Sequence, residues 1–290
     1  MSFELVANGV LAGILTGLVY GLMALGLSVI FGVVRVVNFA HGELMTVAMY
    51  AATLLFARLE LDPFLAVLPV AIAFFVLGYA LQAGLINPFI TRPEHSQFML
   101  LVAVGLIVIN ALLMAFGPDP RSVQVDYQLD SFELGGGLLV DKARLYAAGL
   151  AVLTALALIG VFRFTRTGKA IRACADNHFA AQVVGLNVKR LYAITFGLGA
   201  VCVAVAGCAL TLLFDVTPSV GPQYTLLSFV IVIVGGLGSM LGALLGGVLI
   251  GASEALAGMF ISPSAKSMVS FGLLIVVLIV RPQGLFGRKP

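Results

Sequence analysis

Charged residues are scarce in this sequence. Only 10% of its 290 residues are Asp, Glu, Lys or Arg, whereas a soluble domain carries about 25%. Because so few charges cannot cover a globule with polar surface, a water-soluble fold is excluded and the surrounding solvent must be lipid. The mean hydropathy of +1.13 agrees. No basic patch with interleaved aromatic residues occurs, so we expect no nucleic-acid partner.

Cysteine and histidine are also rare, with three of each. Cys202 and Cys208 are six residues apart and would face different directions on a helix, and neither they nor Cys174 show metal-ligand spacing. The histidines are far apart along the chain, so we expect no metal site. No serine stands in the glycine-flanked pattern of a hydrolase nucleophile, and we expect no catalytic site.

Long continuous apolar runs are what the sequence has instead. A spanning helix needs about 20 apolar residues, and the absence of period-two alternation argues against barrel strands. We therefore predict an all-α polytopic membrane protein with about eight to ten transmembrane helices in one domain over 1–290. The candidate spans are 8–34, 40–57, 64–86, 97–116, 144–164, 191–213, 224–237, 240–260 and 267–281.

Lys and Arg in the short loops indicate the orientation of the chain. They are more frequent in the inner loops when the N-terminus is placed outside and the C-terminus inside, as the positive-inside rule requires. Segment 117–143 is then the longest outer loop. Its prolines, glycines and acidic residues predict an ordered cap or a short strand-like loop. Segment 165–190 is the largest inner loop.

A polar cluster lies between the first two apolar runs. Asn38, Phe39, His41, Gly42 and Glu43 stand where a membrane protein should be apolar, and a charge at the membrane centre costs roughly 2.5 to 3.5 kcal/mol on insertion scales. One interpretation is a broken helix that lines a translocation path. The other is a helix start at the cytosolic surface, with Asn38 as its N-cap.

A glycine-rich turn forms a second interruption. Gly235, Gly236, Gly238 and Ser239 expose backbone that must face protein or water, which makes them candidate path residues. No Lys-Ser or Lys-Thr follows, so the turn is not a phosphate-binding loop. The small-residue pairs that follow predict close helix packing, at Gly242 with Gly246 and at Gly247 with Gly251.

The breaks at 38 and 235 each precede a glycine- or alanine-rich helix, at 38–52 and 235–251. A break followed by a small-residue helix, repeated in this way, is typical of interrupted helices in two pseudo-repeated halves. Glu254, inside the run 240–260, is a further candidate for the path, or it reaches the membrane interface.

The inner loop 165–190 is the most polar internal stretch. Gly168 and Gly185 bracket a segment of helix formers without proline, which predicts one short helix at the cytosolic face. Its small residues allow another protein to approach the helix closely, and its charged residues would orient the two proteins. We interpret it as a helix that docks into a groove of another protein; the alternative is a solvated loop that only maintains topology.

These features together resemble the H-type permease subunit of Liv-type bacterial ABC importers for branched-chain amino acids. The similar stretches are GLVYGLMALGLSVIFGVVRVVNFAHGELM, GKAIRACADNHFAAQVVGLNVKR, GGLGSMLGALLGGVLIGASEAL and SFGLLIVVLIVRPQGLFGR. The resemblance implies a multi-pass subunit of the bacterial inner membrane, surrounded by lipid, without catalysis or a bound cofactor. It further implies alternating access to a path near 38–43 and 235–239.

The resemblance also implies partners. These are a second permease, related or identical, two cytosolic ATP-binding subunits that use ATP, and a periplasmic binding protein that delivers substrate. Loop 165–190 would be the ATPase-coupling loop, with the residues Gly168, Arg172, Ala173, Ala175, Asn177, Gly185 and Asn187. Similar relatives handle branched-chain amino acids, urea, short amides or aromatic acids.

Another class of function stays open from the residues. A stand-alone ion-coupled secondary transporter would need ionisable residues in several spans, for which Glu43 and Glu254 are the acidic candidates.

Overall fold

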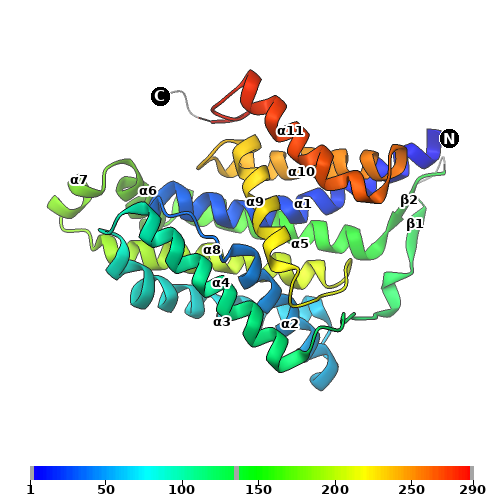
Figure 1. The fold of residues 1–290 in the computed structure, drawn as a ribbon, viewed down its shortest axis with the longest axis horizontal. Coiled ribbons are helices and arrows are strands. Elements are labelled where there is room, and N and C mark those ends of the chain that lie inside the picture. The colour runs from blue at the N-terminus through cyan, green and yellow to red at the C-terminus, as the bar shows by residue number, and fades with distance from the viewer. Residues whose placement is uncertain (1–2, 134–136, 288–290) are drawn as a thin grey trace.

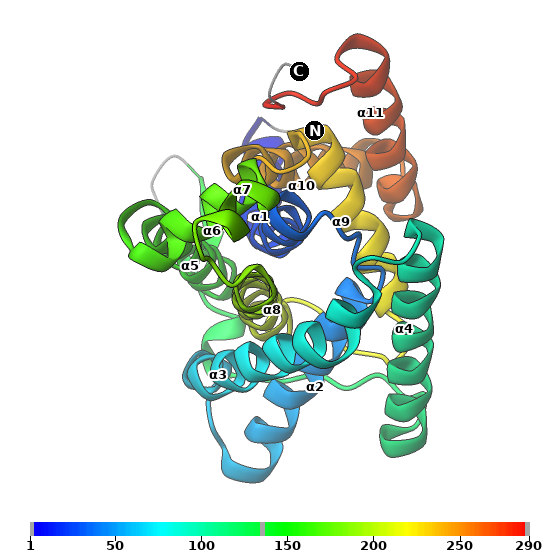
Figure 2. The ribbon, with the colours of Figure 1, turned by 90° about the vertical axis from the view of Figure 1, so that its left-hand side faces the viewer.

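The computed structural model describes residues 3–133 and 137–287, and these form a helical bundle (Figures 1 and 2). The helices are α1 Phe3–Val34, α2 His41–Leu59, α3 Pro63–Leu81, α4 Glu94–Phe116, α5 Lys142–Phe164, α6 Arg166–Asp176, α7 His178–Val183, α8 Val188–Leu210, α9 Gly221–Gly235, α10 Met240–Phe260 and α11 Lys266–Val280. The strands are β1 Ser131–Glu133 and β2 Leu139–Asp141. Short helical turns cover Gln82–Ile86, Asn87–Phe89, Asp126–Gln128 and Pro263–Ala265.

Each of the nine predicted spans corresponds to a helix. Within the described ranges, eight helices are long and apolar enough to cross a membrane, and α9 is shorter with 15 residues. The polytopic all-α prediction is therefore confirmed. Boundaries differ where capping decides them: α8 begins at Val188 rather than 191, because the Asn187 side chain accepts a hydrogen bond from the Arg190 amide.

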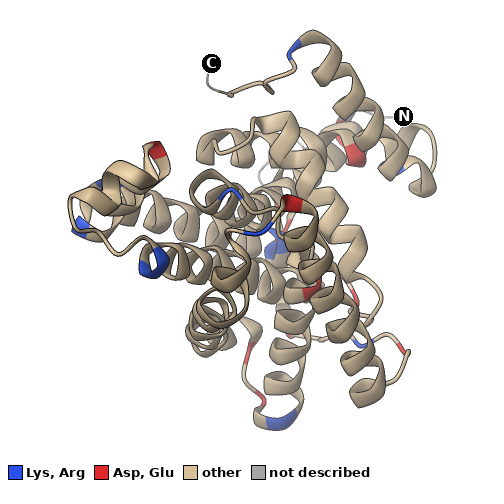
Figure 3. Cartoon of the chain, turned by 60° about the vertical axis from the view of Figure 1, so that its left-hand side comes forward, with Lys and Arg blue, Asp and Glu red and all other residues tan. Residues whose placement is uncertain are grey.

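The bundle has two distinct ends. The start of α1 and the β1–β2 hairpin lie at one end, while α6, α7 and the segment after α11 lie at the other (Figure 1). Asn8 ties the hairpin to α1, since its Nδ2 donates to the Gly137 carbonyl and its Oδ1 accepts from the Leu139 amide. The antiparallel hairpin confirms the strand-like segment predicted within 117–143. Charged residues lie mainly at helix ends and in connections (Figure 3).

Glycines bring α1 and α10 into close contact. A Cβ on Gly13 would lie 2.6 Å from the Gly251 carbonyl oxygen, and a Cβ on Gly17 would lie 2.6 Å from that of Gly247. A Cβ on Gly246 would in turn lie 2.8 Å from the Ile231 carbonyl oxygen of α9. The predicted small-residue packing of α10 is confirmed, and its partners are α1 and α9.

Both α2 and α9 begin inside the protein. After α1 the chain reverses at Arg35, whose φ of 58° is left-handed, and runs back through buried Val36 and Asn38 to the start of α2. The first residue of α9, Gly221, is also buried. The predicted break near residue 38 is thus present, but the N-cap position belongs to Ala40. The prediction that Asn38 is the N-cap is wrong, because its side chain closes a turn before the helix starts.

Candidate functional site

The first turns of α2 and α9 meet in the protein interior. Gly42 lies so close to Gly221 that a side chain there would overlap the Gly221 carbonyl. The Thr225 hydroxyl accepts a 2.8 Å hydrogen bond from the Gly42 amide and donates one of 2.8 Å to Oε2 of Glu43. Two helix N-termini therefore converge on one carboxylate, and both helix dipoles stabilise a negative charge there.

Glu43 is the ionisable group of this junction. Only 5% of it is exposed, and neither ion pair found within the described residues includes it. Its second oxygen, Oε1, faces α4, where a Cβ on Gly105 would lie 3.4 Å away. The carboxylate therefore has one oxygen fixed by Thr225 and one oxygen beside a helix position without a side chain.

Asn38 and His41 are fully buried next to this junction in sequence. Oδ1 of Asn38 accepts from the Ala40 amide at 3.1 Å, and Nε2 of His41 lies 2.9 Å from the Met23 carbonyl oxygen, to which it donates. Within the described part of the chain, Nδ2 of Asn38 and Nδ1 of His41 have no partner. Such burial favours the interior interpretation of this segment over a start at the cytosolic surface.

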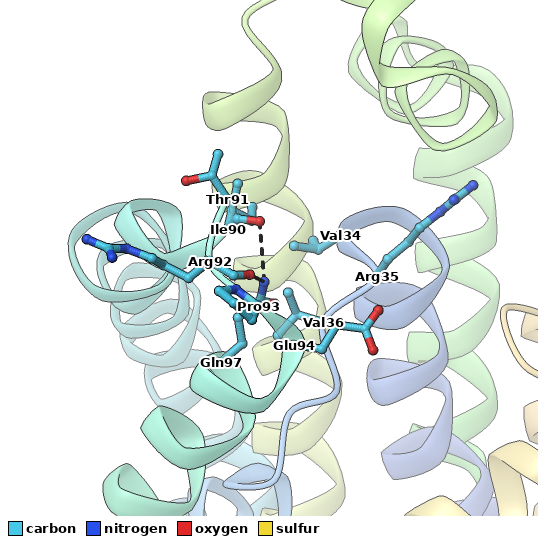
Figure 4. Close-up of a pocket in the computed structure, with 9 residues that line it drawn as sticks. All are labelled: Val34, Arg35, Val36, Ile90, Thr91, Arg92, Pro93, Glu94 and Gln97. Carbon is cyan, nitrogen blue, oxygen red and sulfur yellow. Dashed lines mark hydrogen bonds between the residues drawn. The ribbon is translucent and has the colours of Figure 1, made fainter.

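Phe39 links the junction to an aromatic cluster. Its ring meets Phe98 of α4 edge-on at a centroid distance of 4.4 Å and Phe229 of α9 at 5.0 Å. A cavity of about 470 Å³ lies between the end of α1 and the segment that leads into α4. Figure 4 shows its two walls facing each other, formed by the residues Val34, Arg35 and Val36 on one side and Ile90, Thr91, Arg92, Pro93, Glu94 and Gln97 on the other.

The predicted turn 235–239 lies elsewhere. The atoms nearest to the Cβ positions of Gly236 and Gly238 belong to Phe286, Gly287 and Gly32, and the Leu285 and Phe286 amides donate to carbonyls at the end of α9. Ser239 caps α10 by accepting from the Gly242 amide at 3.1 Å. The structure therefore does not bring this turn to the 38–43 segment.

Glu254 is also separate from the junction of α2 and α9. Its Oε1 accepts a 2.8 Å hydrogen bond from the Ser270 hydroxyl and so connects α10 to α11. The partners that the junction does use, Gly221 and Thr225, stand in an apolar stretch without a distinctive pattern. Gly105 and Phe98 of α4 were likewise missed, because a single glycine or phenylalanine in a span carries no signal by itself.

Segment 165–190 contains two short helices, so the prediction of one helix is wrong. Asn177 ends α6 in an extended conformation and caps α7, with Oδ1 accepting from the Ala180 amide at 3.0 Å. Gly168 packs against the end of α5, and Gly185, at φ +85°, ends the turn after α7. Of the other predicted residues, Arg172, Ala173 and Asn187 are exposed and Ala175 is half-buried.

An apolar patch on this segment was missed. Phe179, Val183 and Val184 expose about 70% of their surface, at 69%, 74% and 74%. They belong to or follow α7, which is too short and too polar to cross a membrane. An exposed apolar patch among exposed Lys and Arg side chains is typical of a protein-binding surface.

Comparisons with known proteins match this architecture over nearly the whole chain. A family described as the permease component of branched-chain amino acid transport systems matches residues 9–278. The high-affinity branched-chain amino acid transport system permease protein LivH of Escherichia coli is 29% identical, over 95% of this chain and 94% of that protein. Permease protein BraD of Pseudomonas aeruginosa is 30% identical over the same shares, and LivM of Escherichia coli is 26% identical over 92% of this chain and 68% of its own length. The chain therefore belongs to the family of permease components of branched-chain amino acid transport systems.

Proposed function

We propose that this chain is the membrane-spanning permease subunit of an ABC importer that translocates branched-chain amino acids. The observation that carries the proposal is the match over nearly its full length to permeases whose names specify high-affinity branched-chain amino acid transport. Substrate comes from a periplasmic binding protein, and two cytosolic ATP-binding subunits supply the energy. The chain itself carries out no catalysis and needs no cofactor.

The junction of α2 and α9 is the centre of the translocation path. Burial of Asn38, His41 and Glu43 beside two helix N-termini supports this placement, because polar groups at membrane depth are kept where they serve a function. Phe39, Phe98 and Phe229 pack together beside this centre and act as its closed inner gate. Movement of α4 or α9 opens the gate in the inward-facing state.

The α6–α7 segment is the surface that receives the ATPases. Exposed Phe179, Val183 and Val184 provide an apolar anchor, and exposed Arg172 provides orientation. The N-terminus then lies outside, and α6, α7 and the C-terminal segment lie at the cytosolic face of the inner membrane.

The second permease subunit is a related chain rather than an identical one. LivH and LivM of Escherichia coli both carry names of high-affinity branched-chain amino acid permease proteins, and this chain is similar to both. Two sequence-related permease subunits of that kind pair in one importer.

Reconstitution of the complete importer in proteoliposomes tests the function. We expect ATP-dependent uptake of leucine, isoleucine or valine only when the binding protein and the ATPases are both present. Uptake by the chain alone, driven by an ion gradient, would instead establish a secondary transporter. Urea, short amides and aromatic acids, each with its own loaded binding protein, test the alternative substrates.

Charge reversal tests the coupling surface. Arg172→Glu should leave the permease in the membrane but separate ATP hydrolysis from uptake. Arg58→Glu is the matched control, since Arg58 is exposed at the end of α2, far along the chain from α6. Normal coupled uptake by Arg172→Glu would contradict the assignment of α6–α7.

A further inference from the structure

The Glu43 carboxylate has an incomplete set of partners. Thr225 supplies one hydrogen bond to Oε2, and no cationic side chain among the described residues pairs with Glu43. Removing a carboxylate from water is costly unless a counter-charge or several donors replace the water. The dipoles of α2 and α9 offset part of this cost, but a full positive charge is still missing.

The second oxygen of Glu43, Oε1, lies beside Gly105 of α4. This helix packs at the edge of the bundle next to α2 (Figure 2), and it buries only a narrow stripe of Leu101, Gly105 and Leu112. Gly105 stands opposite Oε1, where any larger residue would place its side chain against the carboxylate. Gly105 therefore keeps the face of α4 opposite Oε1 free of a side chain.

We propose that Oε1 of Glu43 accepts the ammonium group of the amino acid in transit. The inference rests on the proposed function and assigns this atom a role within it. A substrate ammonium supplies the missing positive charge and three N–H donors. Neutral urea or a short amide carries no charge to pair with the carboxylate, so this chemistry favours an amino acid as the cargo.

A cysteine beside Glu43 tests the charge at this position. Gly105→Cys is made in a background without Cys174, Cys202 and Cys208, and the assembled complex is treated with two thiol reagents. These are cationic aminoethyl methanethiosulfonate and neutral methyl methanethiosulfonate. We expect the rate constant of the cationic reagent, divided by that of the neutral reagent, to fall about tenfold when Glu43→Gln is added, because the negative charge near the thiol is then lost. We also expect leucine to protect the cysteine from both reagents. An equal ratio in both backgrounds, or a thiol unreactive in every state, would overturn the proposal.

Transport by Glu43→Gln gives an independent readout. The amide oxygen still accepts from Thr225, so the junction keeps its geometry while the charge is lost. We expect leucine uptake to fall at least about tenfold, while ATP hydrolysis stimulated by loaded binding protein is retained. Glu133→Gln, on exposed β1, is the matched control and should transport normally. Unchanged uptake by Glu43→Gln would refute the ammonium site, whereas a wild-type complex without ATP-dependent uptake would refute the proposed function.

Discussion

The Thr225 hydroxyl donates a hydrogen bond of 2.8 Å to Oε2 of Glu43, and this bond joins the first turns of α2 and α9 through two residues 182 positions apart in the chain. The same hydroxyl accepts from the Gly42 amide. Thr225 therefore satisfies one unpaired amide of α2 and one carboxylate oxygen at once. Because α2 and α9 both begin inside the protein, these two hydrogen bonds hold the two helix starts together in its interior.

Replacing Thr225 with valine should weaken the junction. Valine has nearly the same shape but leaves the Gly42 amide and Oε2 of Glu43 without their shared partner, at a cost of about 1 to 3 kcal/mol for each buried group. We expect a lower thermal unfolding midpoint in detergent and reduced uptake. Thr225→Ser keeps the hydroxyl and should retain most of the thermal stability and most of the uptake. Equal losses in the two variants would show that packing of the side chain matters, and not its two hydrogen bonds.

The close contact of α1 and α10 should not tolerate even one added methyl group. Gly17→Ala places a Cβ 2.6 Å from the Gly247 carbonyl oxygen, where backbone on both sides must separate. We expect a destabilisation of about 1 to 3 kcal/mol, measured as a lower midpoint of thermal aggregation in detergent. Gly160→Ala on α5, where no atom lies within 4 Å, is the matched control and should be neutral or slightly stabilising.

Local patterns were sufficient to predict the helices and the break near Asn38. Apolar runs of spanning length and small-residue spacing depend on neighbours in sequence, and both match the structure. The partner of the 38–43 segment was not predictable in the same way. The glycine-rich turn 235–239 was the conspicuous choice, but the contact falls to Gly221 and Thr225, which is decided by how α9 crosses the bundle.

In segment 165–190, one continuous helix competes with two short helices separated by an asparagine cap. No glycine or proline lies between Lys169 and Val184, and helix propensity alone therefore predicted one helix. Asn177 instead accepts a hydrogen bond from a backbone amide three residues later and interrupts the helix. Asparagine favours such caps over helix interiors, but whether it caps or continues a helix depends on packing, here of Ile171 and Cys174 against the bundle.

Gly185 should be required for the geometry of the α6–α7 segment. Its φ of +85° is disfavoured for residues with a side chain, so Gly185→Ala should cost about 1 to 2 kcal/mol locally even though nothing lies within 4 Å of its Cβ position. We expect faster hydrogen exchange in α7 and ATP hydrolysis that is poorly coupled to uptake. Gly149→Ala in α5 has equal space and ordinary helical geometry, and it should leave both unchanged.

The loop between α4 and β1 is held to α3 by Tyr127. Its hydroxyl lies 3.0 and 2.9 Å from the two oxygens of Asp62, which also accepts a hydrogen bond from the Phe64 amide at the start of α3. Tyr127→Phe should lower the free energy of unfolding by about 1.5 kcal/mol, the lower end of the range for hydrogen bonds to charged groups, because the site is only partly buried. Hydrogen exchange of 121–133 should become faster. Tyr146→Phe is the matched control, since its ring packs in the same cluster at 5.8 Å from Tyr127.

The stabilisation from the Tyr127–Asp62 contact should be lost at high pH. Burial, and then the bond to Asp62 and its negative charge, raise the pKa of Tyr127 well above its ordinary value of about 10. A raised pKa means that the folded state holds the proton more tightly, so the stabilisation is complete below about pH 10 and is lost as pH rises through the raised value. The stability difference between wild type and Tyr127→Phe should therefore stay constant from neutral pH to about pH 9 and shrink above pH 10. A difference that shrinks between pH 6 and 9 would mean that this hydroxyl does not hold the loop.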